Sequence, residues 1–162
     1  GWRAFLLRHA KRTGWADRFS PARASQKRRM LWPDARAAHA HFAAKDIFQA
    51  WAPGVLDDYI AHGLKAHGEG VQLRFDRDVE TAIYRGLPHH MARIVKPPFP
   101  VPVGFIGGTR SAELRQAGLT GTRKLVGEHF LPIEGGHLFP MESPVEAAGL
   151  TRQMIDKLLA ER

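Results

Sequence analysis

The residue of this 162-residue chain best placed to do chemistry is His137. It follows Gly135 and Gly136, which close a short run of strand character over residues 129–133. The two glycines let the backbone turn sharply, which would leave the imidazole at the carboxyl edge of a sheet, where α/β proteins build their sites. An imidazole there can take a proton from a nucleophile and return it to a leaving group. The alternative is an exposed loop histidine with no catalytic role.

The wider context of His137 narrows the choice between these two roles. Residues 135–144 read Gly-Gly-His-Leu-Phe-Pro-Met-Glu-Ser-Pro. This segment resembles the catalytic-histidine loop of the α/β-hydrolases, whose triad runs in the order Ser, then Asp or Glu, then His along the chain. The resemblance implies that His137 is catalytic, that Leu138 contacts the substrate, and that the chain holds the C-terminal part of an α/β-hydrolase fold.

The triad acid is the weaker part of this resemblance. Residues 102–111 look like the family's penultimate core strand and the turn that commonly delivers the acid. Ser111 stands where that turn carries aspartate and Ala112 follows it, so Glu113 is the nearest carboxylate. Two alternatives stay open: Glu113 is a helix N-terminal glutamate favoured by the helix dipole, or the acid lies on an earlier strand outside this chain.

Residues 28–95 are similar to the helical cap that this superfamily inserts between core strands. The similarity implies that Trp51, Tyr59 and Tyr84 contact a small-molecule substrate. In epoxide-hydrolysing relatives, cap tyrosines activate the epoxide oxygen, so an epoxide hydrolase with an upstream aspartate nucleophile is the runner-up. Packing inside an amphipathic helix is the other role open to both tyrosines.

A nucleophile is missing from the sequence. None of the four serines lies in Gly-x-Ser-x-Gly, and there is no Gly-x-Asp-x-Gly. In the implied fold the nucleophile and its oxyanion donor precede the cap, and the chain starts at Gly1 rather than at methionine. We therefore expect a fragment that lacks its N-terminal core. Its parent would cleave ester-like or lactone bonds through a Ser-acid-His triad, and the chain alone would be inactive.

The elements that must position His137 follow an α/β order after the proline-rich residues 96–100. We predict strands over 101–106 and 129–133 and helices over 111–117 and 144–161, which implies parallel strands. Before them we predict a helical lobe without a sheet. Its helices cover 34–48, 53–62 and 78–84, with Asp34 as an N-cap, and a lone short strand covers 71–75. The predicted domains are therefore a basic segment and cap over 1–96 and part of the core over 97–162.

The charge of the chain is concentrated near its start. Residues 1–36 hold ten Lys or Arg against Asp17 and Asp34, which accounts for the whole net charge of +8. One alternative is a basic nucleic-acid-binding module. The other, which we favour, is a solvated arginine-rich surface without specific nucleic-acid binding.

Composition excludes further classes of site. The chain has no cysteine, so it offers no disulfide, thiolate metal site or cysteine nucleophile. The pairs His39 and His41, and His89 and His90, lack metal-ligand spacing. We expect neither a metal nor a cofactor, because the triad needs none. No apolar run reaches the roughly 18 residues of a membrane span, and no secretory signal is evident, so a cytoplasmic protein without a membrane partner is expected.

Overall fold

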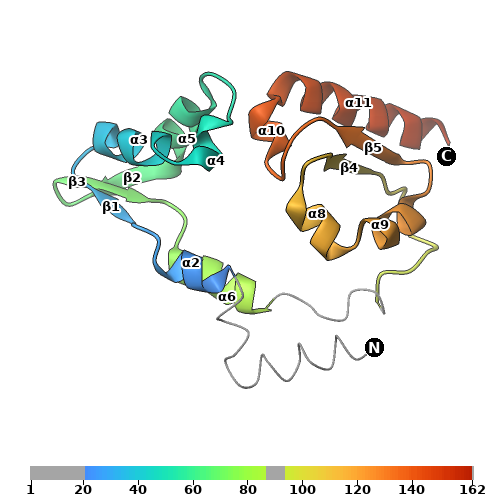
Figure 1. Ribbon diagram of the computed structural model, residues 1–162, viewed down its shortest axis with the longest axis horizontal. Coiled ribbons are helices and arrows are strands. Elements are labelled where there is room, and N and C mark those ends of the chain that lie inside the picture. The colour runs from blue at the N-terminus through green and yellow to red at the C-terminus, as the bar shows by residue number, and fades with distance from the viewer. Residues whose placement is uncertain (1–20, 87–93, 162) are drawn as a thin grey trace. The chain divides into compact units, whose positions relative to one another are not determined.

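The computed structural model describes residues 21–86 and 94–161, which divide into two compact units (Figure 1). The first unit comprises residues up to Lys45 and residues 56–94, and the second comprises residues 46–55 and 95–162. Residues 46–55 thus belong with the second unit, although they lie inside the stretch predicted to be a cap. Residues 1–20, which carry part of the basic segment, lie outside the described residues.

The first unit contains a three-stranded antiparallel sheet in the order β1-β3-β2. The strands are β1 (Leu31–Trp32), β2 (Leu64–His67) and β3 (Gly70–Leu73). Our expectation of a helical lobe without a sheet is therefore wrong. Only β3 coincides with a predicted strand, and it ends earlier than predicted. The strands β1 and β2 escaped prediction because β1 has two residues and β2 is largely polar and exposed, so neither shows a clear hydrophobic alternation.

The hairpin between β2 and β3 has a local signal that explains its register. His67 pairs with Gly70, which leaves a two-residue turn at Gly68 and Glu69. Gly68 has φ +57°, a left-handed conformation that glycine adopts easily and that short hairpin turns require.

Four helices accompany this sheet among the described residues of the first unit: α2 (Ala22–Gln26), α3 (Ala35–Ala43), α5 (Val55–Gly63) and α6 (Arg77–Gly86). The predicted N-cap of α3 is confirmed, because Asp34 accepts a 2.7 Å hydrogen bond from the backbone N–H of Ala37. The single helix predicted over 34–48 is two helices, since α3 ends at Ala43 and the four-residue α4 (Asp46–Gln49) follows. Buried Trp32 and Phe42 lie at the centre of the unit, with ring centroids 5.3 Å apart.

The second unit is built on two parallel strands, β4 (Phe105–Gly108) and β5 (Phe130–Ile133). Figure 1 shows them between α11 (Pro144–Ala160) on one side and α8 (Ala112–Ala117) and α9 (Leu119–Val126) on the other. The short helix α10 (Phe139–Glu142) joins β5 to α11. The parallel pairing, α8 and α11 agree with prediction, whereas α9 was not predicted. The described residues thus mix helix and strand and include a small parallel sheet.

The strand β4 begins four residues later than predicted. Pro102 has no N–H to donate to a ladder, and the backbone N–H of Phe105, at the start of β4, donates to the carbonyl of His129 at 2.8 Å. This shift moves the carboxyl end of β4 to Gly108, next to the end of β5 at Ile133. Within the described residues, no helix is long and apolar enough to cross a membrane.

Candidate catalytic site

His137 lies in the loop that connects β5 to α10, at the carboxyl edge of the parallel pair. The turn after β4 emerges at the same edge, because Gly108 and Ile133 are partners in the ladder. The backbone N–H of Thr109 continues this register with a 2.9 Å hydrogen bond to the Ile133 carbonyl. The turn that precedes Glu113 and the loop that carries His137 therefore lie at the same sheet edge, as the predicted parallel strands imply.

Glycines allow the two segments to approach closely. A Cβ on Gly108 would lie 2.6 Å from the carbonyl oxygen of Gly135 and closer still to that of Gly136, so a side chain is excluded there. Gly135 itself has φ +152°, which residues with a Cβ rarely adopt. The loop that carries His137 is therefore specified by the backbone of β4 as well as by its own sequence.

His137 and Glu113 line the same cavity, whose volume is about 240 Å³. Both side chains are exposed, one from the loop after β5 and one from the first turn of α8. The rest of the lining consists of the strand β4 and of Ser111, Leu114, Thr122 and Phe139. A mostly apolar cavity with a few convergent polar groups is the usual form of a small-molecule site.

Neighbouring groups lower the pKa of the Glu113 carboxyl below its ordinary value. Its own backbone N–H donates to it and lowers its pKa, and the nearby His137, the Ser111 hydroxyl and the charge of Arg115 act in the same direction, while partial burial opposes them. Among the described residues, no hydrogen bond or ion pair joins Glu113 to His137. Glu113 instead accepts a 3.2 Å hydrogen bond from the hydroxyl of Ser111. The predicted role of Glu113 as triad acid stays a prediction.

Ser111, which stands where the resemblance expects aspartate, has a clear local role. It is 3% exposed and is the N-cap of α8, where its hydroxyl accepts a 3.0 Å hydrogen bond from the backbone N–H of Leu114. Serine and aspartate are both favoured N-caps, so the exchange preserves the start of the helix while removing the charge. Its hydroxyl is therefore engaged as acceptor and donor at once.

The predicted substrate contacts are divided between the two units. Leu138 is half-buried, and its carbonyl accepts from Met141 N–H at 2.8 Å; the neighbouring Phe139, rather than Leu138, lines the cavity. Trp51 is in the second unit, 4.6 Å from Phe48 between ring centroids.

Tyr59 and Tyr84 belong to the first unit, on α5 and α6. The ring of Tyr59 meets that of Phe42 edge-on at 5.3 Å, and burial raises the pKa of its phenol. This is the geometry of a packed side chain. The predicted substrate contacts of both tyrosines stay predictions.

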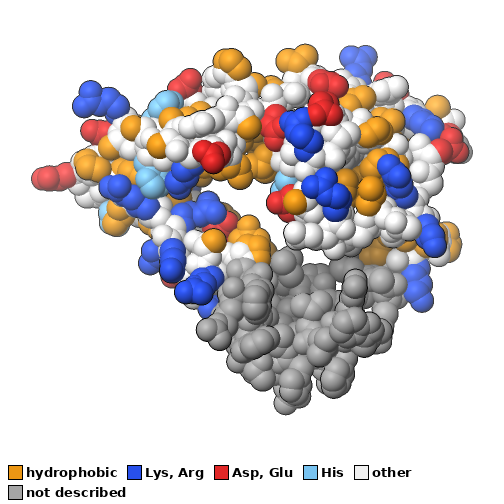
Figure 2. Space-filling view, in the orientation of Figure 1, with side chains coloured by type: hydrophobic (Ala, Val, Ile, Leu, Met, Phe, Trp, Pro, Cys, Tyr) orange, Lys and Arg blue, Asp and Glu red, His pale blue; other side chains and the backbone are white. Residues whose placement is uncertain are grey.

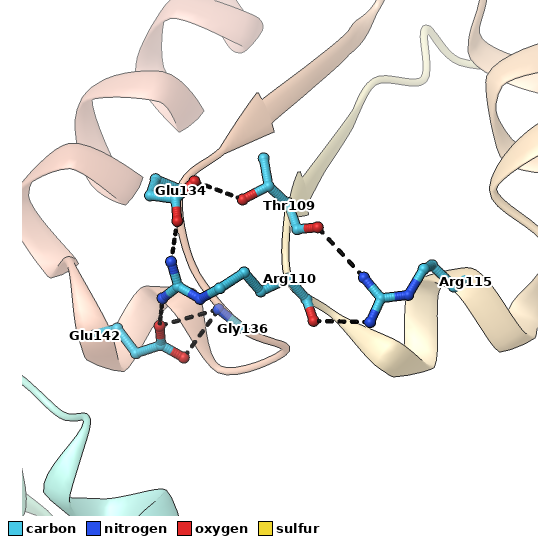
Figure 3. A network of polar contacts seen from close by, with 6 residues as sticks. All are labelled: Thr109, Arg110, Arg115, Glu134, Gly136 and Glu142. Atoms are coloured by element: carbon cyan, nitrogen blue, oxygen red, sulfur yellow. Dashed lines mark hydrogen bonds and ion pairs between the residues drawn. The ribbon is translucent and has the colours of Figure 1, made fainter.

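A polar network beside His137 was missed by sequence reasoning (Figure 3). Arg110 pairs with Glu134, and it also donates to Glu142 at 3.3 Å. Thr109 donates to Glu134 at 2.7 Å, and both oxygens of Glu142 accept from the backbone N–H of Gly136. The sequence signal for this network was a glutamate on each side of the Gly-Gly-His segment, Glu134 and Glu142. The resemblance to the catalytic-histidine loop gave no role to either glutamate.

Comparison of the chain with known protein families, curated proteins and solved structures finds no match. In the described ranges, no group of three or more His, Cys, Asp or Glu side chains could hold a metal ion. The polar side chains that line the cavity are those of His137, Glu113, Ser111 and Thr122.

Lys and Arg side chains do not gather in one patch on the visible face of the described residues. Figure 2 shows them on each unit, interspersed with acidic and apolar side chains. Several Lys and Arg side chains of the described residues are paired, including Arg28 with Glu80 at 2.9 Å and Lys157 with Glu128 at 3.2 Å. The nucleic-acid-binding alternative stays a prediction, because part of the basic segment lies outside the described residues.

Proposed function

We propose that this chain is the C-terminal part of an α/β-hydrolase that cleaves ester-like or lactone bonds in a small molecule, with His137 as its general base and acid. The observation that carries the proposal is the position of His137: exposed at the carboxyl edge of a parallel strand pair, on the wall of a mostly apolar cavity that it shares with Glu113. The Gly-Gly-His segment supports it independently.

The proposed reaction uses the imidazole twice in each half. As a serine oxygen bonds to the substrate carbonyl carbon, its proton passes to His137; the ester C–O bond then breaks, and the departing oxygen takes that proton. Water repeats the sequence on the acyl-serine and releases the acid. No cofactor takes part in these steps.

Glu113 is the candidate for stabilising the protonated imidazole. Its pKa is lowered by its own backbone N–H and by His137, so the carboxylate is charged at neutral pH. To orient His137 through a hydrogen bond, the Glu113 carboxylate must come within hydrogen-bond reach of the imidazole, and it can do so while one of its oxygens still accepts from the Ser111 hydroxyl. An acid on an upstream strand is the alternative within the same proposal.

The serine nucleophile belongs, in this proposal, to a core segment upstream of these residues. The serine that lines the cavity is Ser111, and its hydroxyl already caps α8 and donates to Glu113. This chain together with that upstream core is the complete protein of the experiments that follow.

Covalent labelling of the complete protein by a fluorophosphonate tests the proposal. The reagent reacts with a serine activated by a histidine base. We expect one serine upstream of this chain to be labelled and His137→Ala to suppress the labelling. His62→Ala is the matched control, because His62 is exposed on the last turn of α5 in the other unit. Equal labelling in the two variants, or no labelled serine, contradicts the proposal.

A further inference from the structure

We propose that Glu142 is a positioning residue that fixes the peptide unit between Gly135 and Gly136, which leads into His137. The inference rests on the proposed role of His137 in proton transfer and adds a residue that the triad motif does not contain. Glu142 lies five positions after His137, at the end of α10.

The peptide unit between Gly135 and Gly136 is held at both of its polar ends. Its carbonyl accepts a 2.9 Å hydrogen bond from the backbone N–H of Arg110, and its N–H donates to both carboxylate oxygens of Glu142, at 3.1 and 3.0 Å. Figure 3 shows Gly136 pointing its nitrogen at that carboxylate. With both ends held, this peptide plane cannot flip without breaking hydrogen bonds on each side.

We call the hydrogen bonds that hold this peptide unit the clamp. The negative charge of Glu142 strengthens the hydrogen bonds that its carboxylate accepts from Gly136 N–H. Its side chain is 16% exposed, and a carboxylate that has lost most of its water needs partners for its oxygens. A backbone N–H bound to a carboxylate is roughly twice as strong as a neutral pair. The guanidinium of Arg110 donates to the same carboxylate at 3.3 Å. Arg110 therefore holds the Gly135 carbonyl with its backbone N–H and supports Glu142, which holds the Gly136 N–H, with its side chain.

His137 has no comparable anchor of its own. Its side chain is exposed, and the described part of the chain offers its imidazole no hydrogen bond. The direction of the imidazole therefore depends on the backbone that leads into it, including the peptide unit between Gly135 and Gly136. Because Gly135 and Gly136 permit many conformations, the Glu142 carboxylate removes freedom that the Gly-Gly sequence would otherwise leave. A displacement of about 1 Å at a catalytic group can cost about 10²-fold in rate.

The test uses Glu142→Ala and Glu142→Gln, with Glu146→Ala as the matched control because Glu146 is an exposed glutamate in the first turn of the next helix. In the 162-residue chain, Glu142→Ala should move the amide proton signal of Gly136 upfield and speed its exchange by about 10- to 100-fold, as expected for the loss of a hydrogen bond to a charged group. Glu146→Ala should leave that signal unchanged. Glu142→Gln keeps a carbonyl acceptor and should give an intermediate result.

In the complete protein, Glu142→Ala should lower kcat for a short-chain aryl ester by about 10²-fold with KM within about twofold, and Glu142→Gln should restore part of kcat. An unchanged Gly136 signal in Glu142→Ala overturns the clamp. A changed Gly136 signal with an unchanged kcat overturns the positioning role.

Activity that survives His137→Ala refutes the proposed function and with it the positioning role. The Gly136 signal separates that outcome from a failure of the clamp itself. Should Glu142→Ala not fold, the Glu142→Gln variant decides the same questions.

Discussion

Replacement of Gly108 by alanine tests the close approach on which the candidate site depends. The new Cβ would lie 2.6 Å from the carbonyl oxygen of Gly135 and closer still to that of Gly136. Neither oxygen belongs to a flexible side chain, and the first is held by the backbone N–H of Arg110 at 2.9 Å. The His137 loop must therefore move away from β4, breaking contacts that hold it.

The expected cost is that of overpacking at a rigid position, about 1–3 kcal/mol in the free energy of unfolding. Gly149→Ala is the matched control. Gly149 lies inside α11, and no atom within 4 Å would meet its Cβ. Alanine is the better helix former, so this change should stabilise the chain by about 0.4–1 kcal/mol. The changes in the free energy of unfolding of the two Gly→Ala variants are thus expected to have opposite signs.

Urea denaturation followed by the amide signals of β4 and β5 measures the effect in the unit that carries the site. We expect the unfolding midpoint to fall in Gly108→Ala and to rise slightly in Gly149→Ala. The amide signals of Gly135 and Gly136 should also shift in the first variant alone. A Gly108→Ala chain as stable as wild type, with the signals of both loop glycines unchanged, would refute the close packing of the loop on β4.

Three further expectations concern the same chain. Ser111→Ala should lower the free energy of unfolding by about 0.5–2 kcal/mol, because α8 loses its N-cap, and a change near zero would contradict that role. The pKa of Glu113 is lower in the folded chain than its ordinary value of 4.5, so its stabilising contribution is present above that pH and is lost as the pH falls through the folded pKa. Glu113→Gln should remove this part of the acid sensitivity in urea titrations between about pH 3 and pH 7, whereas an unchanged pH profile would count against the coupling. Binding to duplex DNA should be weak, unselective and lost between about 50 and 200 mM salt, and tight sequence-selective binding at physiological salt would revive the nucleic-acid-binding alternative.

Sequence reasoning succeeded where the determining interactions are local. The N-cap at Asp34 and the amphipathic α11 depend on neighbouring residues, and the structure confirms both. The parallel pair β4 and β5 was also predicted, because apolar runs alternating with helices have few other arrangements. The position of His137 at the sheet edge follows from that pairing.

Sequence-based prediction failed where the interacting residues are far apart in the sequence or where the residue types carry little signal of the contact. The strand β1 pairs with β3 some 40 positions later, through the partners Leu31 with Gln72 and Trp32 with Val71, and two residues carry no periodicity. The hydrogen bonds between Glu142 and Gly136 were not predicted for a related reason. The contact of Glu142 with Gly136 depends on how tightly α10 turns back toward the loop, which the residue types alone do not specify.

The most direct test of the account is the hydrolysis of a short-chain aryl ester by the complete protein, measured side by side for wild type, His137→Ala and His62→Ala. Proton transfer by His137 predicts that kcat/KM falls by about 10³-fold or more in His137→Ala, and that His62→Ala stays within about twofold of wild type. A His137→Ala protein that folds normally and hydrolyses the ester within about tenfold of wild type would contradict the catalytic role of His137.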